Sequence, residues 1–246
     1  HPQVEEKARF RLTGANDELD DSLNSGADKT YFDPDDIQSV RIVLGAGDDH
    51  ASIKSDGDVS VGAWYDLATL EGDGGNDHLT GGDGPDLLLG GDGNDHLKGN
   101  DGNDVLSGGD GDDNLFGDDG LDVLIGGDGL DNLTGGEDDD LQVAGSTAYD
   151  NFADSLQLIM AEWGSGRTYE DRLYNLRHGV GPDGSESDVR LDSTGVDPTV
   201  WDDDDKDKLK GDGGRDWFFA ELDDDNDDLL GTAKDDENID LLDDAP

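Results

Sequence analysis

The sequence predicts a mainly β protein, a parallel β-solenoid interrupted by a small insertion of two helices. Two observations predict this fold class. Residues 72–143 repeat with a period of nine, whereas residues 144–201 lose the period and carry apolar residues at helical spacing. A fixed internal period is typical of architectures in which each repeat buries its apolar side chains against its neighbours.

The composition restricts the partners that the chain can have. It has 246 residues, 31% of them hydrophobic, and its 65 acidic and 16 basic residues give a formal net charge of −49. Such a charge repels nucleic acid phosphates and anionic lipids, so we expect cations as partners and no nucleic acid. The chain has no cysteine to form disulfides. No apolar run approaches the roughly 20 residues of a membrane-spanning helix, so we expect no membrane insertion.

The repeat consists of eight nine-residue units, the first beginning at Gly72 and the last ending at Val143. The sixth position is aspartate in every unit: Asp77, Asp86, Asp95, Asp104, Asp113, Asp122, Asp131 and Asp140. The eighth position is leucine in seven units: Leu79, Leu88, Leu97, Leu106, Leu115, Leu124 and Leu133. A flexible linker of glycine and aspartate would have this composition without this phase.

Each unit is expected to form a turn followed by a strand. Glycines at the first, second and fourth positions permit a tight six-residue turn, and three residues remain for a strand. Two units then make a coil of 18 residues, and coils stack at the usual strand spacing of about 4.8 Å. Side chains alternate along a strand, so the leucines face inward and the aspartates of neighbouring coils, such as Asp77 and Asp95, come together at one edge.

These stacked carboxylates would repel one another unless a cation lies between them. Calcium takes six to eight oxygen ligands at roughly 2.3–2.6 Å and accepts both carboxylates and carbonyls. The oxygen-only ligand set disfavours zinc and copper, and the strict octahedron of magnesium suits a carbonyl-rich turn less well. We therefore expect several calcium ions, about six in the main repeat, one for each pair of stacked aspartates.

The repeat resembles the nonapeptide GGxGxDxUx of the RTX (repeats-in-toxin) calcium-binding proteins, over residues 72–143. The resemblance implies a right-handed parallel β-roll. It also implies calcium held between consecutive turns by sixth-position aspartates and turn carbonyls, and a secreted, extracellular or cell-surface protein that folds in calcium. The turn residues expected to take part, at the first and third positions, are Gly72, Gly74, Gly81, Asp83, Gly90, Asp92, Gly99, Asp101, Gly108, Asp110, Gly117, Asp119, Gly126 and Asp128.

The chain departs from this pattern at four glycine positions. Asp73, Asn100 and Asp118 replace the second glycine of their units, and Asp138 replaces the fourth glycine of the last unit. We therefore expect the calcium sites at the C-terminal end of the repeat to be less secure.

The repeat is expected to continue on both flanks. Upstream, residues 44–52 place Asp49 at the sixth position, and downstream, residues 202–219 place Asp207 and Asp216 there. All three aspartates are candidate calcium ligands. We divide the chain into four parts: an N-terminal β region (1–71), the calcium-binding β-roll (72–143), a helical insertion packing on the roll (144–201), and a resumed coil with an acidic tail (202–246).

The insertion is expected to form two amphipathic helices. Thr147–Asp150 and Thr168–Asp171 have the spacing of helix-capping boxes, and Gly164 and Gly179 are expected at the C-terminal ends. The apolar residues at helical spacing are Phe152, Leu156, Ile159, Trp163, Tyr169, Leu173 and Leu176. This C-terminal part also resembles a segment of large bacterial RTX surface proteins.

The outer faces of the two sheets are expected to differ. Even-numbered units carry apolar residues at the seventh and ninth positions, for example Leu89, Val105 and Ile125, whereas odd-numbered units carry polar ones. We expect the insertion helices, or another subunit or domain, to cover the apolar face. His78 and His96 would stack on the polar face. They could bind a transition metal, although we interpret them as two outward strand residues.

We expect no enzymatic activity, because HExxH and GxSxG motifs and a cysteine nucleophile are absent. The expected function is an extracellular calcium-binding structural module, part of a bacterial surface, adhesive or filament-forming protein. The alternative is the C-terminal secretion and folding cassette of a secreted RTX hydrolase whose catalytic domain lies outside this chain. A third possibility is self-association into a fibre, through coil ends or the apolar sheet.

Overall fold

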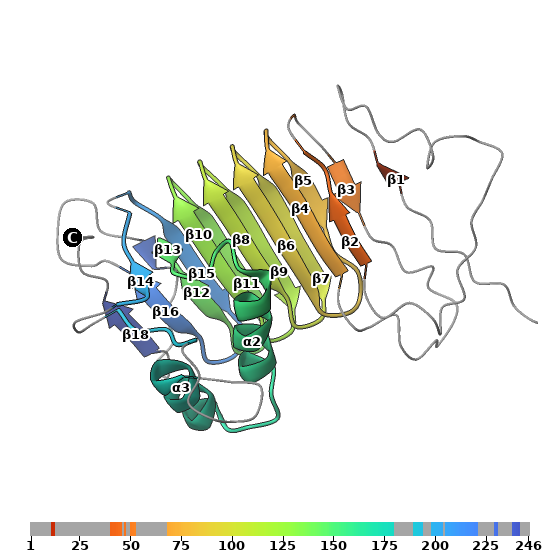
Figure 1. The fold of residues 1–246 in the computed structure, drawn as a ribbon. Coiled ribbons are helices and arrows are strands. Elements are labelled where there is room, and N and C mark those ends of the chain that lie inside the picture. Colours follow the sequence, from red (N-terminus) through yellow and green to blue (C-terminus); the bar gives the residue numbers. More distant parts are fainter. Residues whose placement is uncertain are drawn as a thin grey trace, which may run out of the picture.

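The computed structural model describes residues 11–12, 40–45, 47, 50–52, 68–179, 189–193, 198–203, 205–220, 229–230 and 238–241. These residues form a β-solenoid of two facing sheets, with two helices on one side (Figure 1). The predicted fold class, mainly β with a two-helix insertion, is therefore confirmed. No helix among them is both long and apolar enough to cross a membrane.

The odd-numbered units form one sheet, called sheet A here. Its strands, in spatial order, are β1 (Arg11–Leu12), β3 (His50–Ser52), β5 (His78–Thr80), β7 (His96–Asp101), β9 (Asn114–Asp119), β11 (Asn132–Glu137), β15 (Lys208–Asp212) and β17 (Leu229–Leu230). All neighbours in sheet A pair in parallel except β1, which is antiparallel to β3.

The even-numbered units form the facing sheet, called sheet B, which is parallel throughout its described strands. In spatial order these are β18 (Asn238–Leu241), β16 (Trp217–Ala220), β12 (Leu141–Val143), β10 (Val123–Asp128), β8 (Val105–Asp110), β6 (Asp86–Asp92), β4 (Ala68–Gly74) and β2 (Val40–Val43). A short antiparallel pair, β13 (Ser146–Thr147) with β14 (Val200–Trp201), closes the base of the insertion.

Successive coils are in register at the predicted interval of 18 residues. In sheet B, for example, Leu106 pairs with Leu88 on one side and with Leu124 on the other. The eighth-position leucines point between the sheets, and all seven are at most 1% exposed. Burying such a ladder of leucines stabilises the narrow core by the hydrophobic effect.

The strands are longer than the three residues predicted from the repeat. Strands β7 to β11 each have six residues, running from the seventh position of one unit to the third position of the next. The predicted strands were too short because glycines at the first two turn positions still pair with those of the neighbouring coil, as Gly91 does with Gly109. The sheets therefore extend into the first half of each turn.

The chain resumes the same register after the insertion. Strand β15 pairs with β11 and β16 with β12, so that Leu209 lies beside Leu133 and Phe218 beside Gln142. The coil after the insertion thus stacks directly on the last coil before it, as Figure 1 shows for β15 and β16.

The insertion contains helices α2 (Ala153–Trp163) and α3 (Tyr169–His178). Thr168 caps α3 as predicted, because its side chain accepts a hydrogen bond from the Asp171 backbone N–H. The predicted capping box at Thr147 was wrong. Thr147 lies in β13, and its backbone N–H and hydroxyl donate hydrogen bonds to Asp150 within a turn before α2. Consequently α2 begins at Ala153 without a side-chain cap, and Phe152 is 62% exposed rather than buried.

The outer faces of the two sheets differ as predicted. On sheet B, Leu87, Val105, Val123 and Ile125 are buried, and α2 contacts β8 and β10. On sheet A, the corresponding side chains, such as His96 and Asn114, remain partly exposed. The apolar face of sheet B is therefore largely covered within the chain itself. The division of the chain into four parts stays a prediction.

Candidate functional site

The sixth-position aspartates form one ladder along each edge of the solenoid. In every case the backbone N–H of one aspartate donates to the Oδ1 atom of the aspartate one coil further on. On the first edge, Asp77 donates to Asp95 at 2.7 Å, Asp95 to Asp113 at 2.7 Å and Asp113 to Asp131 at 2.7 Å. On the second edge, Asp86 donates to Asp104 at 2.8 Å, Asp104 to Asp122 at 2.8 Å and Asp122 to Asp140 at 3.0 Å.

The second carboxylate oxygen of Asp86 accepts a hydrogen bond from the Gly82 backbone N–H at 2.6 Å, whereas in six other members of the ladders this oxygen is buried without such a bond. The aspartates whose Oδ2 atoms are buried without a hydrogen-bond partner are Asp95, Asp104, Asp113, Asp122, Asp131 and Asp140. Burying a charged oxygen without a compensating partner is strongly unfavourable. A row of such oxygens therefore requires protons or cations.

A backbone carbonyl from the next coil faces five of these oxygens, those of Asp95, Asp104, Asp113, Asp122 and Asp131. A β-carbon added to Gly108 would lie 2.2 Å from Asp113 Oδ2 and 2.5 Å from the carbonyl oxygen of Gly126. The same pair of oxygens, a sixth-position carboxylate and a first-position carbonyl, meets at Gly90 and at Gly117. Only glycine leaves this space open, and a converging carboxylate and carbonyl are the oxygen ligands that calcium prefers.

The third-position carbonyls lie in a different environment from the first-position carbonyls. Those of Asp92, Asp110 and Asp128 accept hydrogen bonds of 2.7–2.8 Å from the backbone N–H of a glycine one coil earlier. One lone pair of each oxygen is thus used by the solenoid backbone. The first-position carbonyls, in contrast, meet the carboxylate oxygens at Gly90, Gly108 and Gly117.

Burial and mutual repulsion raise the pKa of these carboxyl groups. Burial, followed by the charges of Asp122 and Asp86, raises the pKa of Asp104 to about 9. Burial, followed by Asp131 and Asp95, raises the pKa of Asp113 to about 8, although the hydrogen bond from Asp95 lowers it. Without a cation, these groups hold protons at neutral pH, so a bound metal ion must displace protons.

The ladders continue beyond the insertion. Asp131 donates its backbone N–H to Asp207 Oδ1 at 2.6 Å, and Asp140 donates to Asp216 Oδ1 at 2.9 Å. Asp207 and Asp216 are both fully buried. The structure thus places these two downstream aspartates at the ends of the same ladders, whereas Asp49 lies outside the described residues.

The described residues hold no group of three or more His, Cys, Asp or Glu side chains arranged around a metal position. At Gly90, Gly108 and Gly117, the space between coils is lined by a carboxylate oxygen and a backbone carbonyl. Carbonyl ligands suit a hard cation such as calcium and not zinc or copper.

A second ladder at the fifth turn position was missed from the sequence. Its side chains accept from the backbone N–H one coil further on: Asn76 from Asn94 at 2.8 Å, Asn94 from Asp112 at 3.3 Å, Asn103 from Leu121 at 2.9 Å, and Asp112 from Leu130 at 3.1 Å. The signal was present, because Asn or Asp recurs at this position. These bonds hold the turns together independently of any metal.

The histidines of sheet A stack as predicted. The ring centroids of His78 and His96 are 5.3 Å apart, and those of His50 and His78 are 5.9 Å apart. Burial, then the nearby His78 and Lys98, lowers the pKa of His96. The ammonium group of Lys98 disfavours an added cation here, in agreement with the interpretation as outward strand residues.

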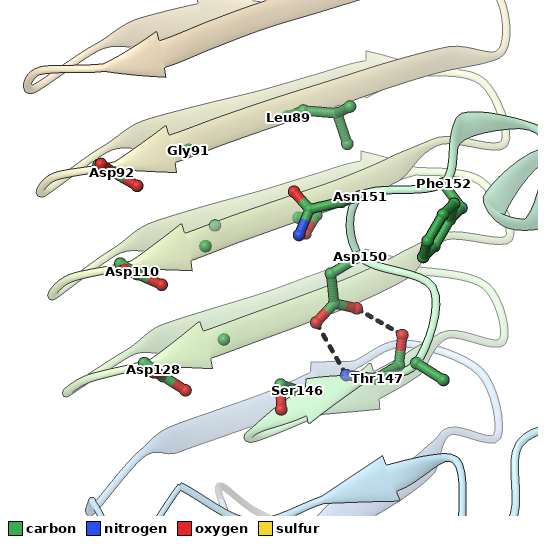
Figure 2. A pocket seen from close by; sticks show the side chains of 15 residues that line it. Leu89, Gly91, Asp92, Asp110, Asp128, Ser146, Thr147, Asp150, Asn151 and Phe152 are labelled. Carbon is green, nitrogen blue, oxygen red and sulfur yellow. Dashed lines mark hydrogen bonds between the residues drawn. The ribbon is translucent and has the colours of Figure 1, made fainter.

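A groove of about 340 Å³ lies between sheet B and the segment leading into α2 (Figure 2). Asp92, Asp110 and Asp128 line one side and Asp150 the other. Burial, with a contribution from Asp128, raises the pKa of Asp150 to about 6, although hydrogen bonds from Thr147 oppose the shift. Asp150 is thus engaged in the turn before α2.

Comparison with known families agrees with this geometry. The model of the RTX calcium-binding nonapeptide repeat matches the chain in four copies, at residues 71–106, 89–124, 107–142 and 199–226. No curated protein and no solved structure matches the chain significantly. The matched ranges include both aspartate ladders and the two downstream aspartates.

Proposed function

We propose that this chain, whose residues 71–142 and 199–226 are RTX calcium-binding nonapeptide repeats, is an extracellular structural module that folds and stiffens when it binds calcium. The ligands in this proposal are the sixth-position aspartates from Asp77 to Asp140, Asp207 and Asp216, together with turn carbonyls. About six ions would occupy the main repeat. Calcium would supply positive charge between carboxylates that otherwise repel one another.

One observation carries the proposal: six buried Oδ2 atoms without a hydrogen-bond partner lie in two ladders. Backbone carbonyls of the next coil converge on five of the same spaces. Folding and calcium binding would then be one event, because the ligands from neighbouring coils meet only in the folded chain.

The proposed location is the cell surface or the extracellular medium, where calcium is abundant. A role in a surface, adhesive or filament-forming protein fits a module without a catalytic motif. The alternative role, as the secretion and folding cassette of a hydrolase, requires a catalytic domain encoded elsewhere in the parent gene, and the gene sequence tests it. Because α2 covers much of the apolar face, fibre formation would have to use the coil ends.

The test is circular dichroism of the metal-stripped protein during titration with calcium, with magnesium as the control. We expect a cooperative transition from disorder to β structure with calcium, and little change with magnesium. A chain that is equally ordered without calcium would overturn the proposal.

A further inference from the structure

The seam of the solenoid, where the coil after the insertion stacks on the coil before it, brings two distant turns together. Asp140 in the first turn and Asp216 in the second are separated by 76 residues, and Asp140 donates its backbone N–H to Asp216 Oδ1 at 2.9 Å. Asp140 is fully buried, and its Oδ2 atom has no hydrogen-bond partner. The carboxylate ladder therefore crosses the seam.

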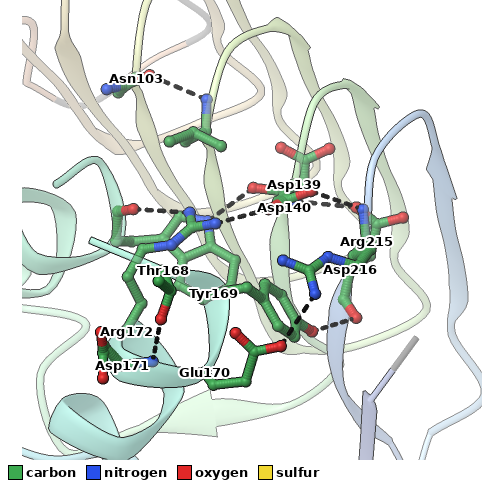
Figure 3. A network of polar contacts seen from close by, with 12 residues as sticks. Asn103, Asp139, Asp140, Thr168, Tyr169, Glu170, Asp171, Arg172, Arg215 and Asp216 are labelled. Atoms are coloured by element: carbon green, nitrogen blue, oxygen red, sulfur yellow. Dashed lines mark hydrogen bonds and ion pairs between the residues drawn. The ribbon is translucent and has the colours of Figure 1, made fainter. Parts of the chain in front are cut away.

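The helical hairpin α2–α3 holds the first turn (Figure 3). The Trp163 indole N–H donates to the carbonyl oxygen of Asp139 at 2.9 Å, and Arg172 Nη2 contacts Asp139 Oδ2 at 2.6 Å. Arg172 Nη1 also donates to the carbonyl oxygen of Trp163 at 2.9 Å. Because Arg172 is only 4% exposed, its guanidinium forms a fixed bridge between the hairpin and the turn.

The same hairpin holds the second turn. The Tyr169 hydroxyl donates to the carbonyl oxygen of Asp216 at 2.9 Å, and Glu170 contacts Arg215 Nη1 at 3.2 Å. The two turns are also joined directly, because the Arg215 backbone N–H donates to Asp139 Oδ1 at 2.8 Å. Figure 3 shows these side chains converging between α3 and the two turns.

The seam needs such an attachment more than the other coil junctions do. Elsewhere in the repeat, stacked aspartates are 18 residues apart, as Asp104 and Asp122 are. At the seam the chain closes a loop about four times longer, which increases the entropy lost when the two turns meet. Tyr169 and Arg172 oppose this loss by fixing both turns to one rigid element.

We propose that Tyr169 and Arg172 are positioning residues for the calcium ion that Asp140 and Asp216, two of the proposed ladder ligands, would share, and that this ion staples the resumed coil to the roll. The proposal rests on the proposed function, since it requires that the ladders bind calcium. It adds that these two ligands, which come from opposite sides of the insertion, depend on α3 for their geometry.

Removal of Arg172 can either strengthen or weaken cation binding, and the direction distinguishes a positioning role from a purely electrostatic one. A guanidinium near a cation site repels the ion, so removing it would strengthen binding if charge alone mattered. If Arg172 positions the turn that carries Asp140, its removal weakens binding.

Terbium luminescence excited through tryptophan provides a readout of this site. Residues 72–143 contain no tryptophan, whereas Trp217 directly follows Asp216 and lies 6.1 Å from Trp163 between ring centroids. Trp64 and Trp201 are changed to Phe in all proteins to remove other donors. Terbium is a hard cation that takes oxygen ligands as calcium does, so it is titrated into the metal-stripped chain.

In this background, Asp216→Asn should lower the sensitised emission, leaving only the part that Trp163 excites from an ion bound by Asp122 and Asp140. Tyr169→Phe should raise the terbium concentration at half-saturation roughly fivefold, as expected for one lost hydrogen bond. Arg172→Met, which removes two hydrogen bonds, should raise it by more. Tyr174→Phe, on the exposed side of the same helix, is the matched control and should leave it unchanged. The calcium midpoint of the dichroism transition, which reports the main roll, should stay within about twofold in the variants.

The result that overturns this inference is a normal calcium transition with terbium emission insensitive to Asp216→Asn, or tighter binding by Arg172→Met. If the parent protein shows no calcium transition at all, the proposed function fails instead. A variant whose emission and calcium midpoint shift equally would also refute a local positioning role, since a general loss of stability moves both.

Discussion

At the residue scale, the turns tolerate departures from glycine only where the replacement adopts its conformation. Within the part of the chain that the structure describes, the non-glycine residues with positive φ are Asp73 (68°), Asn100 (83°), Asp118 (78°), Asp138 (73°) and Asp212 (69°). Each occupies a second or fourth turn position, and each is Asp or Asn. These two residue types enter the left-handed region more readily than other side chains. The four departures noted in residues 72–143 are therefore compatible with the turn.

Substitution of Asp73 tests this interpretation. Asp73→Ala should lower the free energy of unfolding in calcium by about 1–2 kcal/mol, because alanine is strained at positive φ. Asp73→Gly should be close to neutral. The measurement is chemical denaturation in saturating calcium.

The control for this test is Asp92→Ala. Asp92 is an exposed acidic residue of the neighbouring turn without positive φ, and alanine keeps the backbone carbonyl through which Asp92 is a candidate calcium ligand, so its replacement should change stability little. Equal destabilisation by Asp73→Ala and Asp92→Ala would show that lost charge, and not backbone strain, is responsible.

At the scale of elements, each strand from β5 to β11 contributes one eighth-position leucine to a thin core between the two sheets. Leu115 in β9 lies between Leu97 and Leu133 and is fully buried, whereas Leu130, in the turn before β11, is 49% exposed. A thin core cannot easily rearrange around a missing side chain, since each leucine is held in register by two paired strands.

Leu115→Ala should therefore lower the free energy of unfolding in calcium by roughly 2–5 kcal/mol, the usual range for a buried leucine. Leu130→Ala removes the same atoms from an exposed position and should change it by less than about 0.5 kcal/mol. Denaturant unfolding of the two variants side by side measures the difference. Similar losses in both would contradict the assignment of the core.

At the scale of the whole molecule, a formal net charge of −49 opposes compaction, and the buried ladders add to this repulsion. The raised pKa values show how the metal-free chain relieves part of it, by binding protons. Calcium and protons therefore compete for the same carboxylates.

This competition predicts the pH dependence of the metal-free protein. Burial raises the pKa of Asp95 to about 6, of Asp113 to about 8 and of Asp104 to about 9, all above the ordinary value of 3.8. The folded chain then binds more protons than the unfolded chain. Its stability is highest below about pH 4 and is lost as pH rises through about 6 to 9. Circular dichroism of metal-stripped protein should show more β structure at about pH 5.5 than at about pH 9.

Salt separates this effect from general charge repulsion. Added sodium chloride screens surface charges but does not protonate buried carboxyls. If high salt at about pH 9 restores as much β structure as mild acid does, the buried groups are not responsible.

The sequence by itself determined the repeat, the register, the buried leucines and the stacking of the sixth-position aspartates, because these follow from local periodicity. Residues at the same position of each unit must coincide when coils stack. It also placed Asp207 and Asp216 in phase with the repeat, and Thr168 at the start of α3.

Only the tertiary structure decided how the insertion meets the roll. The contacts of Arg172 with Asp139 and of Tyr169 with Asp216 join segments that share no periodicity, so no pattern in the chain could predict them. The start of α2 likewise depends on strand pairing, since Thr147 pairs with Val200 in the β13–β14 ladder and does not enter the helix. Local patterns determine elements that repeat, whereas contacts between unlike elements depend on how distant surfaces pack.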